Sequence, residues 1–183
     1  MDFRLFYDGP LKANGSPTAK HAIRQAVHRQ LKELLGRKAT SHVKRMIDQR
    51  KESATFLAVS QFEFVPLISE RLNHAADLHI TFLTPEEPGR VVTQGGDLDN
   101  RLKTLLDALR CPKNVGELPG AATPSEDEAP FFCLLEDDAL VSALSVTTDR
   151  LLRPASSPSD VVLVIHVIPR SLHTSLGTVV WVG

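Results

Sequence analysis

The sequence has few cysteines and no long apolar run, and both shortages exclude classes of protein. Its 183 residues include two cysteines, Cys111 and Cys133, without the CxxC spacing of a zinc or redox motif. We therefore expect reduced thiols. No stretch reaches the roughly 18 to 20 apolar residues of a membrane span, and the first residues lack the basic start and apolar middle of a signal peptide. We expect no membrane partner and a cytoplasmic location.

Histidine pairs at metal-binding spacing are also missing. The seven histidines are scattered, and none stands in an HxxxH or HExxH arrangement. Aromatic residues make up 5% of the chain and do not alternate with its basic residues, so stacking on nucleic-acid bases has little support. A histidine metal centre is therefore not expected.

Positive charge is concentrated in the first third, although the formal net charge of the chain is only -1. Residues 1–51 contain 12 Lys and Arg against 4 Asp and Glu, whereas the remainder contains 9 against 18. Such a basic region can attract a polyanion, but it can equally be a solvated surface. Charge alone leaves both interpretations open.

Periodicity predicts a strand and two helices in this basic region. Residues 3–7 alternate as a short strand and end at an Asp-Gly-Pro turn. Ser16 and Pro17 are typical of a helix start, and apolar residues follow at helical spacing as far as Gly36. A second helix is expected over about 40–52. The basic side chains predicted on the exposed faces of these helices are Lys20, Arg24, His28, Lys32, Lys44, Arg45, Arg50 and Lys51.

Sheet patterns alternate with loops in the rest of the chain. Residues 56–66 and 76–83 are rich in aromatic and β-branched residues, and 161–168 has the clearest strand pattern. Leucines at helical spacing predict a helix that starts close to Asp99, whereas residues 139–147 fit either a strand or a short helix. Together with the length, these patterns indicate a single domain over 1–183.

One long segment has no periodicity. Residues 111–130 contain four prolines and the acidic run Glu126-Asp127-Glu128, so we expect an irregular, mobile loop. Phe131 and Phe132 follow it. These rings could wedge into a nucleic-acid junction, but phenylalanine is more often used in core packing.

The sequence GGDLDNRLK, residues 95–103, concentrates polar groups where the loop meets the predicted helix. Asp97 and Asp99 flank a leucine that would face the core, so both carboxylates can project from the turn. Polar residues follow at helical spacings of three and four, namely Asn100, Lys103 and Asp107. Mg²⁺ would relieve the repulsion between the carboxylates, because it takes hard oxygen ligands and few protein groups. A second cluster, Glu136-Asp137-Asp138, could add ligands if the fold brings it near.

A structural interpretation of the same residues is equally simple. Aspartate, asparagine and glycine are favoured at helix starts by capping alone. A pair such as Asp99 and Lys103, four residues apart, is an ordinary surface interaction of a few tenths of a kcal/mol, roughly. An isolated DxDN motif therefore does not by itself establish a metal site.

Taken as a set, the pattern D-L-D-N-x-x-K-x-x-x-D-A-L followed by an acidic pair resembles the RusA family of Holliday junction resolvases and related phage-type endodeoxyribonucleases. The matching residues are Asp97, Asp99, Asn100, Lys103, Asp107, Ala108, Leu109, Asp137 and Asp138. The resemblance implies an α+β domain with a small mixed sheet packed against helices, assembled as a homodimer. It also implies a magnesium-dependent endonuclease that cuts branched DNA such as four-way junctions, with manganese as an alternative metal.

The resemblance further implies roles for individual residues. Asp97, Asp99 and Asp138 would bind the metal with support from Asp137, and Lys103 would offset charge on the phosphate. Asn100 and Asp107 would orient these groups. The basic residues that would contact DNA phosphates are Arg24, His28, Lys32, Lys44, Arg45, Arg50 and Lys51. A catalytically inactive nucleic-acid-binding or scaffold protein, or a nuclease for flaps, RNA or phage DNA, remains an alternative.

Overall fold

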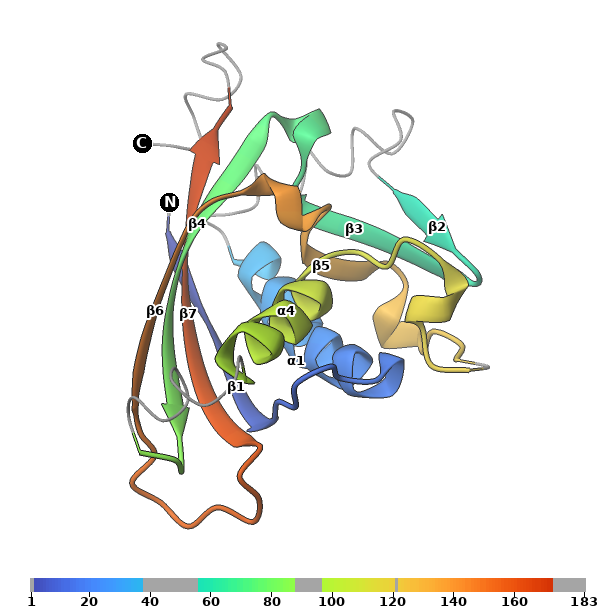
Figure 1. The fold of residues 1–183 in the computed structure, drawn as a ribbon. Helices are drawn as coiled ribbons and strands as arrows, with labels where there is room; N and C mark the ends of the chain where they lie inside the picture. The colour runs from blue at the N-terminus through green and yellow to red at the C-terminus, as the bar shows by residue number, and fades with distance from the viewer. Residues whose placement is uncertain (1, 38–55, 88–96, 121, 173–183) are drawn as a thin grey trace.

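The fold combines two β-sheets with two α-helices, in a computed structural model that describes residues 2–37, 56–87, 97–120 and 122–172, with only the backbone of Asp97 (Figure 1). The predicted α+β class is confirmed. The expectation of one small sheet is corrected, because the strands form two sheets, each with parallel and antiparallel pairs. The predicted helix over about 40–52, with Lys44, Arg45, Arg50 and Lys51, lies outside the described residues.

The larger sheet has four strands in the order β1-β7-β4-β6. The strand bounds are Phe3–Pro10 for β1, His74–Thr84 for β4, Val141–Arg150 for β6 and Asp160–Ser171 for β7. β7 pairs antiparallel with both β1 and β4, whereas β6 pairs in parallel with β4. β1 and β6 are therefore the two edges of this sheet.

The smaller sheet has three strands in the order β2-β3-β5. Its strands are β2 (Leu57–Val59), β3 (Phe62–Ile68) and β5 (Phe131–Leu135). β3 pairs antiparallel with β2 and in parallel with β5. Phe131 is completely buried in this part of the molecule, which confirms core packing for that ring.

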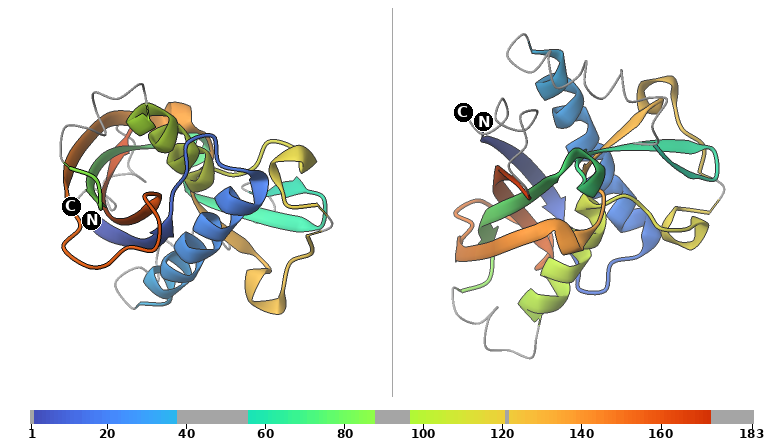
Figure 2. Two further views of the ribbon diagram at one scale, coloured as in Figure 1. Left: turned by 60° about the horizontal axis from the view of Figure 1, so that its bottom comes forward. Right: turned by 90° about the horizontal axis from the view of Figure 1, so that it is seen from above.

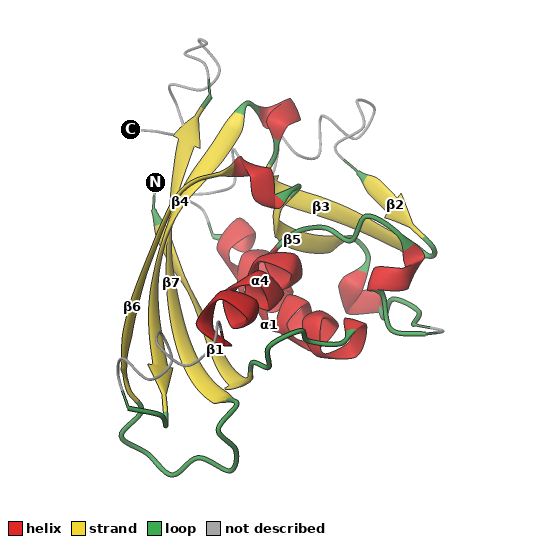
Figure 3. Cartoon of the chain, viewed as in Figure 1, coloured by secondary structure: helices red, strands yellow, loops and turns green. Residues whose placement is uncertain are grey.

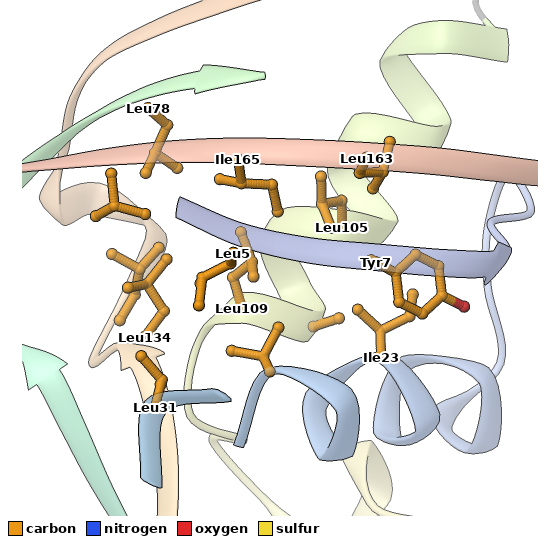
Figure 4. Packing of buried hydrophobic residues seen from close by; sticks show 14 of the residues in the cluster. Leu5, Tyr7, Ile23, Leu31, Leu78, Leu105, Leu109, Leu134, Leu163 and Ile165 are labelled. Atoms are coloured by element: carbon orange, nitrogen blue, oxygen red, sulfur yellow. The ribbon is translucent and has the colours of Figure 1, made fainter. Parts of the chain in front are cut away.

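Helices α1 (Pro17–Gly36) and α4 (Asp97–Leu109) pack on the same face of the larger sheet (Figure 3). The Ser16 side chain caps α1 by accepting a hydrogen bond from the Ala19 backbone, as the Ser-Pro start predicts. Side chains from both helices and from the strands meet in one core, which Figure 4 shows around Leu105 and Ile165. α4 starts at Asp97, two residues earlier than expected.

α1 is buried on two faces because it lies between the two sheets (Figure 2). One face packs on β1 and the core of the larger sheet, and another packs on β5. The sequence prediction assumed one apolar face and one solvent face. That assumption is wrong for Arg24 and His28, which are each only 1% exposed.

Residues 111–130 form an irregular segment, as predicted, but several contacts hold it against the rest of the chain. It contains the short 3-10 turns η4 (Val115–Glu117) and η5 (Glu126–Glu128), and Leu118 is buried in the smaller core. The η5 turn is bonded to α1 through Gln25 Nε2 and Glu128 Oε1, 2.7 Å apart.

The remaining turns connect the two sheets. η3 (Glu70–Leu72) joins β3 to β4, and η6 (Asp138–Leu140) joins β5 to β6. Residues 139–147 are therefore the end of a turn and then a strand, rather than a helix. No helix in the described ranges is long and apolar enough to cross a membrane.

Candidate functional site

α4 carries most of the residues predicted to act on DNA. Its buried face, including Leu105, Ala108 and Leu109, packs into the core and fixes the helix against the larger sheet. The loop before α1 also contacts it, because the Gly15 backbone N–H donates to Thr104 Oγ1 at 3.0 Å. The polar face of α4 is thus held by packing on the opposite side.

The first half of α4 presents exposed polar groups. Asp99 and Lys103 are both exposed and stand one helical turn apart, whereas Asn100 is half-buried. Leu98 and Leu102 pack against the core, so the predicted division of the helix into an apolar and a polar face is confirmed. This arrangement leaves a carboxylate and an ammonium group open to a ligand.

The acidic pair lies at the turn between β5 and β6. The Asp137 side chain caps η6 by accepting from the Ala139 backbone N–H at 3.0 Å, and Asp138 is the exposed first residue of that turn. Lys113 Nζ lies 2.6 Å from Asp137 Oδ2. The hydrogen bond from Lys113 is the main cause that lowers the pKa of Asp137 to about 2. Asp137 is therefore held by a protein cation, and Asp138 is the freer carboxylate.

η6 packs against α4, but the acidic pair begins near the C-terminal end of that helix. The Cys111 backbone N–H donates to the Leu135 carbonyl at 2.9 Å, which joins the chain after α4 to the end of β5. Asp99 and Leu109 are separated by about 15 Å along an ideal helix. Within the described side chains, no three His, Cys, Asp or Glu gather as metal ligands. Convergence of Asp97, Asp99 and Asp138 stays a prediction.

Asp107 belongs to a different network from the one predicted. Its carboxylate contacts Lys20 Nζ at 2.6 Å and Arg110 Nη2 at 3.1 Å. Arg110 also pairs with Glu117 at 2.9 Å, so this network ties α1 and α4 to the start of the irregular segment. Burial alone would raise the pKa of Asp107, but Lys20 and Arg110 together lower it. These contacts give Asp107 a structural role at the far end of the helix.

The predicted DNA-contacting side chains of α1 are used within the protein. Arg24 donates to the backbone carbonyls of Asp107 and Arg110, at 3.0 and 3.3 Å, and is not available to DNA. His28 Nδ1 accepts from the Phe132 backbone N–H at 2.9 Å, and its Nε2 lies 3.0 Å from the Asp127 carbonyl. The assignment of Arg24 and His28 to a DNA surface is therefore wrong.

Lys32 is the one predicted α1 contact that remains partly open. Its side chain is 46% exposed, and it forms an ion pair with Asp127 of the η5 turn. A DNA phosphate would have to displace that carboxylate. Lys20, which the charge pattern also placed outside, is bound by Asp107.

A cleft of about 590 Å³ lies beside the acidic pair, with Cys111, Lys113, Glu136 and Asp137 in its wall. Both cysteines are free and buried, as reduced thiols would be, and burial is the largest cause that raises the pKa of Cys111. Lys113 was missed by the sequence analysis. It belongs to a segment without periodicity, so no local pattern linked it to a carboxylate 24 residues later.

Comparison of the chain with protein-family models, with curated proteins and with solved structures finds no significant match in any of the three. Any functional assignment therefore rests on the residues and their arrangement.

Proposed function

We propose that the protein is a magnesium-dependent endonuclease that hydrolyses phosphodiester bonds in branched DNA and acts as a homodimer. The observation that carries the proposal is the exposure of Asp99 and Lys103 one turn apart on α4, with Asp138 exposed on a turn packed against that helix. The stability of the fold does not by itself require three exposed charged side chains at this place.

The donor set is suited to Mg²⁺. Asp99 and Asp138 are exposed carboxylates, which are the hard oxygen ligands that Mg²⁺ prefers, and Asp97 would complete the set. The ion, when bound, would supply Lewis acidity and lower the pKa of a bound water. Asp137 would contribute less directly to metal binding, because its carboxylate already forms an ion pair with Lys113.

The side chains of α4 would act on the substrate around these carboxylates. Lys103 would place its ammonium group near the scissile phosphate and stabilise the charge that develops on its oxygens. Asn100, half-buried beside Asp99 in the sequence, would orient the carboxylate or the phosphate by hydrogen bonding. No base is read in this scheme, since every contact is to a phosphate or its metal.

The test is a cleavage assay with Mg²⁺ on a four-way junction, a flap and a linear duplex. We expect the junction to be nicked and Asp99→Asn to slow cleavage by about 100-fold or more while junction binding persists. Glu33→Gln, an exposed carboxylate on α1, is the matched control and should cut normally. Normal cleavage by Asp99→Asn would remove this site from the mechanism.

One observation favours a second candidate, a nucleic-acid-binding protein without catalysis. Lys113 neutralises Asp137, and the described side chains include no group of three metal ligands. This candidate predicts junction binding without cleavage in either Mg²⁺ or Mn²⁺. A Lys113→Ala variant that gained cleavage would decide against it.

A further inference from the structure

β6 lies at one edge of the larger sheet, and at its end the Arg150 backbone N–H donates to the Asp149 side chain at 2.7 Å. It pairs with β4 on one side, and within the described residues no strand pairs with its other side. None of its ten residues is buried. A strand edge in this state presents a row of free backbone N–H and C=O groups to another chain.

The residues of β6 favour pairing rather than prevent it. The strand VSALSVTTDR is rich in Val, Thr and Ser, and it has neither proline nor lysine, the two residues that commonly protect an edge. Leu144 lies beside Leu78 of β4 in the register. Leu78 is completely buried, yet Leu144 is 43% exposed, so the apolar surface continues past the last strand.

The opposite edge of the same sheet is occupied at Phe6. Gln30 of α1 accepts a hydrogen bond from the Phe6 backbone N–H at 2.8 Å and donates one to the Phe6 carbonyl at 2.7 Å. The side-chain amide thus makes the two bonds that a neighbouring antiparallel strand would make. A second chain cannot add to β1 at Phe6 unless Gln30 leaves.

We propose that β6 is the dimer interface, where it pairs antiparallel with β6 of a second copy to form one continuous sheet. A β6 edge that met β1 of another copy would repeat without end and give fibres, whereas two β6 edges close on each other. Because Gln30 blocks β1, the closed arrangement is the one that these edges permit. This inference deepens the proposed function and rests on its homodimer, but not on its nuclease chemistry.

The pairing would also bring a residue from one copy to the candidate site of the other. In an antiparallel pair centred on β6, the start of one strand lies beside the end of its neighbour. The η6 turn, which begins with Asp138, directly precedes β6, and Arg150 ends the strand. Arg150 of the partner subunit would therefore lie near the acidic turn. Its positive charge would attract the negative carboxylates of that turn.

The first test compares two exposed apolar residues on the two edges. Leu144→Lys and Phe6→Lys replace side chains that are 43% and 50% exposed, so both variants should fold, as far-ultraviolet circular dichroism would check. Sedimentation velocity over a concentration series should show a dimer for the wild type and for Phe6→Lys. Leu144→Lys should raise the dimer dissociation constant by about tenfold or more, because it places two like charges as diagonal neighbours on one face of the paired strands.

The second test fixes the orientation by disulfide trapping. Ser145→Cys lies at the centre of β6, so the two copies of residue 145 should meet and form a covalent dimer under mild oxidation. Ser142→Cys is the matched control. In the antiparallel arrangement its two copies are roughly 20 Å apart, too far to cross-link.

These outcomes separate the interface from the enzyme. A wild-type monomer at all concentrations, a dimer unaffected by Leu144→Lys, or equal cross-linking at 142 and 145 would each overturn the β6 interface. Junction cleavage by a protein with any of those results would leave the nuclease proposal standing. A β6 dimer that never cuts DNA would support the interface and overturn the nuclease proposal.

Discussion

The two ends of α4 hold charged side chains in different ways. At the first end, Asp99 and Lys103 are exposed to solvent. At the last end, Asp107 and Arg110 are bound in a network with Lys20 and Glu117, and the Arg110 side chain is only 9% exposed. The difference teaches that charge on a helix has two uses. The bound charges connect elements of the fold, whereas the free ones are available to a ligand.

Replacement of Arg110 by alanine should be the largest perturbation of the bound end. The variant leaves Asp107 and Glu117 without their shared partner, and breaking such a buried pair costs about 3 kcal/mol in the free energy of unfolding. Urea denaturation measures this loss. Arg153→Ala, which removes an exposed ion pair with Asp8, is the control and should cost less than about 1 kcal/mol. Equal losses of unfolding free energy in the two variants would contradict the idea that the network around Arg110 stabilises the fold.

Acid should weaken the buried contacts that two histidines of α1 make. Burial is the main cause that lowers the pKa of His21 and His28 in the folded protein. The unfolded chain then binds more protons, so stability is full above about pH 6.5 and falls as the pH drops below it. The slope is up to about 1.4 kcal/mol per pH unit for each histidine.

Denaturation at pH 7.5, 6.5 and 5.5 measures that slope. His28→Gln should reduce it, because the variant removes one of the two buried imidazoles. A flat stability profile for the wild type across this range would contradict the burial argument.

Lys32→Ala should have a smaller effect, because its pair with Asp127 is exposed. Exposed pairs contribute little to the free energy of unfolding, and salt screens them. The measurement is the unfolding free energy in low and high salt. We expect the difference between wild type and variant to shrink as salt is added. A large loss that is independent of salt would move Lys32 into the same class as Arg110.

Asp99→Asn should have the smallest effect on stability, within about 0.5 kcal/mol, because the side chain is exposed. Thermal unfolding monitored by circular dichroism provides the test. Combined with lost cleavage, an unchanged melting temperature would sharpen the contrast between the two ends. A marked destabilisation would mean that Asp99 serves the fold by capping.

Much of the secondary structure could be predicted because it depends on local patterns. The Ser16-Pro17 start and the helical spacing that follows locate α1 correctly, and alternation locates β1 and β7. The leucines of α4 also gave its buried face correctly, since one side of that helix packs on the core.

The rest depended on contacts between distant segments. Arg24 and His28 look like surface residues on a helical wheel, but the smaller sheet and the irregular segment bury them from a second direction. Lys113 and Asp137 likewise meet only because the chain after α4 joins the end of β5. The spacing of residues within one helix or strand cannot predict contacts between distant segments.

The contact between Gly15 and Thr104 gives the loop before α1 a further consequence. A Cβ atom at position 15 would stand 2.6 Å from Thr104 Cγ2, a distance at which one of the two must move. Because Gly15 has no side chain, the loop and α4 can approach each other this closely. Any side chain placed at position 15 would displace either the loop or Thr104, which lies next to Lys103, although position 15 is far from both in sequence.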